Sequence, residues 1–243
     1  MSLSRLSYAM HHSLSEKSQL PDEDAKINPT TIRIAIFDDH TLIREMIAKS
    51  LNTTPGFEVV ATGQSAADAI AAAEAHLPDV IIMDINMPGD GIKGAREIKS
   101  RFPVVKIIML TSDDSEHLVS SALRAGAVGY VVKGSPVRQI SRAVSDAAKG
   151  YSYVSSSLAS KLLAPRAFGT PWFDDSATPA LVITDTEAQI LSRLAQGLTN
   201  EEIGAGTGLD GDTVGKFLSN ILTKLQDCER ADEIVQAQSS GRD

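Results

Sequence analysis

Short apolar runs alternate with longer helical patterns five times between residues 32 and 148 of this 243-residue chain. Each run is rich in β-branched residues and too short for a helix, which predicts a buried strand. The runs are Ile32–Phe37, Glu58–Thr62, Asp79–Met83, Val104–Leu110 and Val128–Val132. The helical stretches between them are Leu42–Leu51, Ala66–His76, Ile92–Arg101, Ser115–Ala125 and Pro136–Ala148. Continuously apolar strands that alternate with helices predict a doubly wound α/β domain with a parallel sheet over residues 31–150.

Three further segments flank this domain. Residues 1–30 are polar and rich in Ser and His, which predicts a disordered leader. Residues 151–180 combine a short helical pattern with a proline-rich stretch that holds the single tryptophan, Trp172, and we interpret them as a linker. Residues 181–243 are helical in pattern and predict a small all-α domain.

The pattern of the last segment indicates four short helices. Thr184 and Glu187 have the spacing of a capping box at the start of the first helix. Asn200–Thr207 forms a second helix, and Asp210 caps a third with an apolar stripe through Leu225. A fourth is expected over roughly 230–238. Four short helices with a tight glycine-containing turn predict a helix-turn-helix module.

Composition and charge limit the function. The chain has one cysteine, so an internal disulfide is excluded, and it has no apolar run long enough to span a bilayer. The N-terminus lacks the apolar core of a signal peptide. The net charge is −8, and residues 181–243 hold five basic against eleven acidic residues. An acidic segment is unfavourable for a domain that must contact phosphate groups.

Polar side chains follow four of the five predicted strands. Asp38 and Asp39 follow the first strand, Asp84 the third, Thr111 the fourth and Lys133 the fifth. Because the carboxyl ends of parallel strands surround one crevice, these groups are expected to converge. Three carboxylates require a cation, and hard oxygen ligands suit Mg²⁺. A carboxylate beside such an ion can accept a phosphoryl group, with a lysine and a hydroxyl stabilising the transferred oxygens.

Four motifs make residues 31–150 resemble a response-regulator receiver domain, which has a flavodoxin-like five-stranded sheet. They are IAIFDDH (34–40), IIMDINMPG (81–89), IIMLTS (107–112) and GYVVKG (129–134). The resemblance implies that Asp84 is the phospho-acceptor and that Thr111 and Lys133 hold the phosphoryl group. It implies that Mg²⁺ is held by Asp39, Asp38, Asp84 and the backbone carbonyl of Asn86. It also implies that Tyr130 is a switch aromatic. The loop after Pro88 is one residue shorter than the usual pattern, which affects access to the pocket or the lifetime of the phosphoryl group.

Residues 183–236 resemble a LuxR-type helix-turn-helix, so the whole chain resembles the NarL/FixJ class. The motifs are ITDTEAQIL (183–191), AQGLTNEEI (195–203), TVGKFLSNILTKL (213–225) and RADEIV (230–235). The resemblance implies DNA contacts from Thr199, Asn200, Thr213, Val214, Lys216, Ser219 and Lys224. The pattern usually has Lys and His where this chain has Gly215 and Phe217, and Gly204 and Gly206 interrupt the preceding helix.

Two functions of different class remain open. The first is a cytoplasmic, phosphorylation-controlled transcription regulator, not an enzyme beyond its own phosphorylation and dephosphorylation. A histidine kinase supplies the phosphoryl group, and a homodimer binds promoter DNA. The second is a receiver whose acidic helix-turn-helix binds protein instead. Steep salt dependence of DNA binding discriminates between them, because cations that contact phosphates displace counterions. Neither function involves a membrane.

Overall fold

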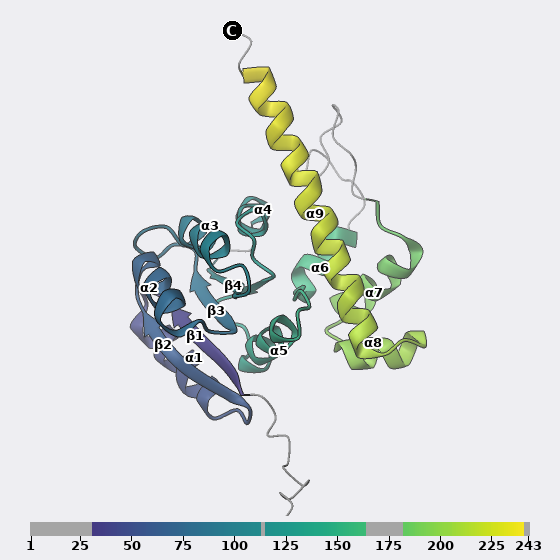
Figure 1. Ribbon diagram of the computed structural model, residues 1–243. Coiled ribbons are helices and arrows are strands. Elements are labelled where there is room, and N and C mark those ends of the chain that lie inside the picture. Colours follow the sequence, from purple (N-terminus) through teal and green to yellow (C-terminus); the bar gives the residue numbers. More distant parts are fainter. Residues whose placement is uncertain (1–30, 113–114, 164–181, 241–243) are drawn as a thin grey trace, which may run out of the picture. The chain divides into compact units, whose positions relative to one another are not determined.

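A computed structural model describes residues 31–112, 115–163 and 182–240. The predicted leader, Trp172 and most of the proline-rich linker lie outside the described residues. The first part of the chain alternates strands and helices (Figure 1). In order, the elements are β1 (Ile32–Phe37), α1 (Thr41–Asn52), β2 (Phe57–Gly63), α2 (Ala66–His76), β3 (Val80–Asp84), α3 (Gly91–Arg101), β4 (Lys106–Thr111), α4 (Glu116–Arg124), β5 (Gly129–Val132) and α5 (Val137–Ala148). The predicted strands and helices are all present, with ends that differ by a few residues.

The five strands form one parallel sheet in the order β2-β1-β3-β4-β5. This order confirms the predicted doubly wound, flavodoxin-like fold. The order reverses beside β1, which pairs with β2 on one side and with β3 on the other. A ligand site is therefore expected at the carboxyl ends of β1 and β3.

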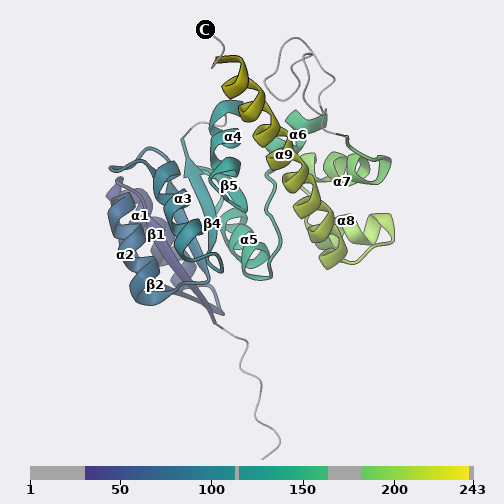
Figure 2. The same ribbon diagram turned by 45° about the horizontal axis from the view of Figure 1, so that its top comes forward.

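Alternate side chains of each strand pack on opposite faces of the sheet. On one face, Ile34, Ile82 and Ile108 pack in a cluster with buried residues of α1 and α5. On the other, Phe37, Met83 and Met109 pack in a cluster with residues of α2, α3 and α4. Figure 2 shows these helices on either side of the strands. Because both faces are covered, β1, β3, β4 and β5 are apolar at most positions, which is why they could be recognised in the sequence.

The remaining elements are helical. They are α6 (Ser156–Leu163), α7 (Asp185–Ala195), α8 (Asn200–Thr207) and α9 (Gly211–Ser240). Both predicted caps are present: Thr184 and Glu187 form a capping box, and Asp210 Oδ1 accepts a hydrogen bond from Thr213 N at 2.6 Å. Gly204 lies within α8, where the turn that follows the helix packs closely on it. A Cβ at this position would lie 2.6 Å from Leu209 O.

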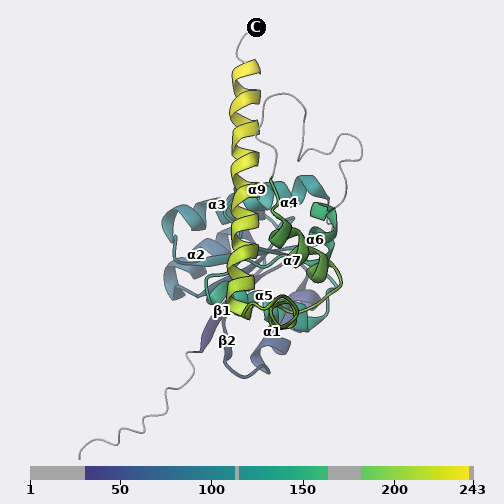
Figure 3. The ribbon, with the colours of Figure 1, turned by 90° about the vertical axis from the view of Figure 1, so that its right-hand side faces the viewer.

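The predicted third and fourth helices are one helix, so that part of the prediction is wrong. Figure 3 shows α9 as a single unbroken helix. Residues 226–238 contain neither glycine nor proline, so no residue there stops the helix once it has begun. Within the described residues, no helix is both long enough and apolar enough to cross a membrane.

Candidate functional site

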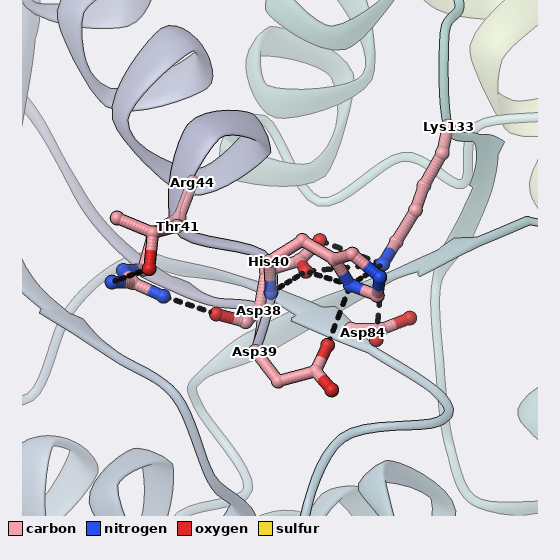
Figure 4. Close-up of polar contacts among 7 residues, drawn as sticks. All are labelled: Asp38, Asp39, His40, Thr41, Arg44, Asp84 and Lys133. Atoms are coloured by element: carbon pink, nitrogen blue, oxygen red, sulfur yellow. Dashed lines mark hydrogen bonds and ion pairs between the residues drawn. The ribbon is translucent and has the colours of Figure 1, made fainter.

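The carboxyl ends of β1, β3 and β5 bring Asp38, Asp84 and Lys133 into contact (Figure 4). Lys133 Nζ lies 2.9 Å from Asp38 Oδ2 and 3.0 Å from Asp84 Oδ2. It also donates a hydrogen bond to Asp38 Oδ1 at 3.0 Å. The three side chains come from positions 38, 84 and 133, so the sheet topology alone brings them together.

Burial shifts the pKa values of the charged groups in this cluster. Asp38 is 0% exposed and Asp84 is 1% exposed. Burial raises the pKa of the Asp84 carboxyl above its usual value, and contact with the Lys133 ammonium only partly opposes this. Burial lowers the pKa of Lys133, but hydrogen bonds to Asp38 and Asp84 outweigh it and leave the pKa above its usual value. The lysine therefore stays charged and balances part of the negative charge of the two buried carboxylates.

The residues present fit a divalent cation. Asp84 Oδ1 is buried and has no hydrogen-bond partner among the described residues, and the geometry at Asp38 Oδ2 and Asp84 Oδ2 gives an ion pair with Lys133 but no hydrogen bond. One ligand atom each from Asp38, Asp39, His40 and Asp84 lies within 4.8 Å of the others. Three carboxylates and one ammonium leave a net charge of −2, which a dication balances.

The other predicted receiver residues surround this cluster. Thr111 is fully buried at the end of β4, and its carbonyl accepts a hydrogen bond from Lys133 N at 2.5 Å. Asn86 is exposed in the loop after β3 and lines an open hollow of about 490 Å³. Tyr130 is 2% exposed and packs in the same hydrophobic cluster as the buried residues of α2, α3 and α4. Its ring is therefore buried.

Several contacts at the site were not predicted from the sequence. Arg44 of α1 donates a hydrogen bond to the Asp38 carbonyl at 2.5 Å and a second to Thr41 Oγ1 at 3.3 Å (Figure 4). His40 contacts both neighbouring carboxylates. Arg44 lies one helical turn into α1, within reach of the loop that precedes the helix. A basic residue at this position could therefore have indicated a hydrogen bond to the backbone of that loop.

The short loop after β3 depends on unusual backbone geometry. Asp90 has φ +66° and caps α3 by accepting hydrogen bonds from Ile92 N and Lys93 N. At Gly91, a Cβ would lie 2.0 Å from the Asp84 carbonyl oxygen. The start of α3 thus rests directly on the backbone of the proposed phospho-acceptor, which only glycine permits.

The predicted DNA-contact residues of the helical domain differ in exposure. Lys216 is exposed on the first turns of α9, whereas Val214 is fully buried in the core. Asn200 is 3% exposed, and its Oδ1 accepts a hydrogen bond from Arg142 of α5 at 2.7 Å. Ser219 Oγ accepts a hydrogen bond from Ser152 N at 2.8 Å. Thr199 caps α8 through Glu202 N, and Thr213 lies half-buried at the start of α9.

Lys224 has a structural contact in place of the expected DNA contact. Its Nζ lies 2.8 Å from both carboxylate oxygens of Glu187 and donates to Val182 O at 3.1 Å. Burial raises the pKa of Glu187, but bonds from Lys224 and Thr184 outweigh it, so the net pKa is lowered. Glu187 is the buried carboxylate of the capping box, and Lys224 supplies its counter-charge. Val214 is fully buried and is not retained among the proposed DNA contacts, and a contact between Lys224 and DNA would require the ion pair with Glu187 to break.

Gly215, where the LuxR-type pattern usually has lysine, packs closely on an aromatic ring. A Cβ at this position would lie 2.8 Å from Tyr151 Cγ and 2.9 Å from Tyr151 Cδ2. A lysine side chain therefore does not fit here unless Tyr151 moves. The departure from the family pattern has a local structural reason.

The buried Asp146 of α5 makes the stability of the fold depend on pH. Burial raises the pKa of its carboxyl to about 6, although Arg142 Nε lies 3.8 Å away and opposes the shift. Because the folded-state pKa lies above the usual value of 3.8, the ionised form destabilises the fold, and stability falls as pH rises from about 4 to 6. We expect Asp146→Asn to raise the free energy of unfolding at pH 7.5 by roughly 2–3 kcal/mol. The gain should shrink as the pH approaches 4.

Urea unfolding of the wild type and variant at several pH values measures this difference. Glu45→Gln on α1 removes an exposed carboxylate and serves as the control. A gain for Asp146→Asn that does not change with pH would contradict the explanation by ionisation.

Comparison with known proteins agrees with both parts of this structure. Residues 34–145 match the response regulator receiver domain family, and residues 181–237 match the luxR family of bacterial regulatory proteins. The transcriptional regulatory protein DegU of Brevibacillus brevis is 32% identical over 89% of this chain and 97% of its own. The DNA-binding transcriptional activator DevR/DosR of Mycobacterium tuberculosis is 33% identical over 80% of this chain and 88% of its own.

A solved structure gives the same result for the fold. The two-component response regulator of the LuxR family from Aurantimonas sp. SI85-9A1 is 30% identical, with a TM-score of 0.52 over 54% of this chain and 95% of its own. The two curated relatives are transcriptional regulators by name and match almost the whole of this chain. The chain therefore belongs to the NarL/LuxR-type response regulators of two-component systems, in which a receiver domain precedes a LuxR-type helix-turn-helix.

Proposed function

We propose that Asp84 accepts a phosphoryl group from a histidine kinase in the cytoplasm and thereby controls DNA binding by the helical domain. The observation that carries the proposal is the buried Asp84 carboxylate. One of its oxygens has no hydrogen-bond partner among the residues that the structure describes, and the other lies 3.0 Å from Lys133 Nζ. An oxygen of this kind can act as a nucleophile towards phosphorus.

The proposed reaction is a transfer between two side chains. An Asp84 oxygen attacks the phosphorus of a phosphohistidine, the P–N bond breaks as the P–O bond forms, and the released imidazole takes up a proton. Lys133 Nζ lies 3.0 Å from Asp84 Oδ2, and Thr111 ends β4, the strand that pairs with β3. Both residues are proposed to hold the phosphoryl oxygens. Asp38, Asp39, Asp84 and the Asn86 carbonyl would hold Mg²⁺, which supplies positive charge to those oxygens when bound.

The output is proposed to be promoter binding by a phosphorylation-dependent homodimer. The relatives DegU and DevR/DosR are named as a transcriptional regulatory protein and a DNA-binding transcriptional activator. These names support the proposal that the helical domain binds DNA and not a protein partner. Lys216 is the exposed cation at the start of α9, the helix that the family places in the major groove. Asn200 and Ser219 accept bonds from Arg142 and Ser152, so their contact with DNA would require those bonds to break.

Salt dependence of DNA binding tests this output. Anisotropy of pooled duplex fragments is measured from about 50 to 200 mM salt with full-length protein, Mg²⁺ and beryllofluoride. We expect affinity to weaken steeply over this range. Absence of binding at the lowest salt would select the alternative, a helical domain that binds protein.

Lys216→Ala tests the proposed phosphate contact. We expect the log–log salt slope to become shallower by about 0.9 per subunit, because one fewer counterion is displaced. Lys149→Ala removes the same charge from an exposed receiver position and should leave the slope unchanged. Equal slopes for the wild type and Lys216→Ala would show that Lys216 does not contact DNA.

A further inference from the structure

His40 adds a nitrogen to the cluster of Asp38, Asp39 and Asp84, called the acidic pocket below. Its Nδ1 lies 2.7 Å from Asp39 Oδ1 and 3.2 Å from Asp38 Oδ1, and Lys133 Nζ is 3.5 Å away (Figure 4). The ring is therefore held beside the same carboxylates that would bind a cation. Its side chain is 63% exposed, so no part of the core depends on it.

The pocket also holds buried ligand atoms that the protein leaves unpaired. Asp84 Oδ1 is buried and lacks a hydrogen-bond partner among the described residues, and Asp38 is 0% exposed. Unpaired buried carboxylate oxygens are costly unless a cation reaches them. This observation points to a bound cation independently of the histidine.

We propose that His40 supplies a nitrogen ligand through which this pocket binds Zn²⁺ in competition with Mg²⁺. The inference rests on the proposed function, since the pocket is the proposed phosphorylation site. Mg²⁺ takes oxygen ligands and retains several waters, so the imidazole contributes little to its binding. Zn²⁺ favours four ligands drawn from imidazole nitrogen and carboxylate oxygen, and Asp38, Asp39, His40 and Asp84 offer that set within 4.8 Å.

Proton balance requires one rearrangement at the histidine. Nδ1 must present a lone pair, so its proton moves to Nε2 in the neutral ring or is released to solvent from the charged ring. The exposed ring leaves Nε2 open to water for this purpose. A Zn²⁺ ion held by His40 and Asp84 would also occupy an oxygen of the proposed phospho-acceptor, so bound Zn²⁺ is expected to slow phosphorylation.

Calorimetric titration of the full-length chain tests the proposal. Zn²⁺ is titrated with and without excess Mg²⁺, and only the heat that Mg²⁺ suppresses reports on this pocket, because Mg²⁺ does not displace Zn²⁺ from isolated histidines elsewhere. We expect His40→Ala to weaken this Mg²⁺-sensitive Zn²⁺ binding by about 10-fold or more, with less than about a twofold change in Mg²⁺ affinity. The backbone bond from residue 40 N to Asp38 Oδ1, 2.8 Å in the wild type, remains available in the variant.

His76→Ala is the matched control, because His76 is an exposed histidine at the end of α2. It should leave the Mg²⁺-sensitive Zn²⁺ binding unchanged. Equal Zn²⁺ affinity in the wild type and His40→Ala, an equal loss in His76→Ala, or Zn²⁺ binding that Mg²⁺ never suppresses would overturn the inference. If the wild type is phosphorylated and binds Mg²⁺ in any of these cases, only the role of His40 fails. A wild type that binds no Mg²⁺ and is not phosphorylated refutes the proposed function as well.

Discussion

Asp84→Asn is expected to reduce phosphorylation of the chain by at least about 1,000-fold, because an amide is not a nucleophile towards phosphorus. Incubation with a small phosphodonor and Mg²⁺, followed by intact-mass measurement, shows whether a phosphoryl group has been added. The loss cannot be attributed to unfolding. Asp84 is 1% exposed and burial raises its pKa, so removing this charge should leave the free energy of unfolding unchanged or higher.

Asp90→Asn is the matched control for this experiment. Asp90 lies six positions further along, in the loop after β3, and caps α3. Asparagine caps helices as well as aspartate and tolerates the positive φ found there, so the loop should keep its geometry. Phosphorylation of the Asp84→Asn chain at the wild-type rate would place the acceptor at another residue.

The sheet and its pocket could be predicted because they depend on patterns that the sequence carries locally. Buried strands such as Val80–Asp84 are apolar at every position but the last, and a polar residue at that end marks the edge of the sheet. Parallel topology then brings Asp38, Asp84 and Lys133 together without any knowledge of their contacts. The capping residue Thr184 was likewise predictable, since its partner Glu187 lies three residues away.

The contacts that escaped prediction depend on distances between segments that no local pattern records. Lys224 and Glu187 lie 37 positions apart, and their pairing follows from how α9 packs on α7. Val214 belongs both to the apolar stripe of α9 and to the DNA contacts implied by the LuxR-type resemblance, and its complete burial favours the stripe. The close approach of Gly91 to the Asp84 carbonyl depends on the backbone path of the loop after β3, which no local sequence pattern records.

Lys133→Met is expected to lower the free energy of unfolding by about 3–5 kcal/mol in the absence of divalent cations, because it leaves two buried carboxylates without their counter-charge. Lys133 has a side chain only 9% exposed, with Nζ within 3.0 Å of both Asp38 and Asp84. Methionine keeps most of the side-chain volume, so the loss reports on charge more than on packing. Urea unfolding with excess chelator measures the effect.

Adding Mg²⁺ should restore much of that loss, since a dication bound between the carboxylates replaces the missing ammonium and stabilises only the folded chain. Lys93→Met is the control: Lys93 is 78% exposed and pairs with Asp90 at 3.5 Å on the surface, where ion pairs contribute little. Its unfolding should change little with or without Mg²⁺. A Lys133→Met chain as stable as the wild type in chelator would mean that the buried carboxylates are already protonated. Asp84 would then have to lose a proton before it could act as the nucleophile.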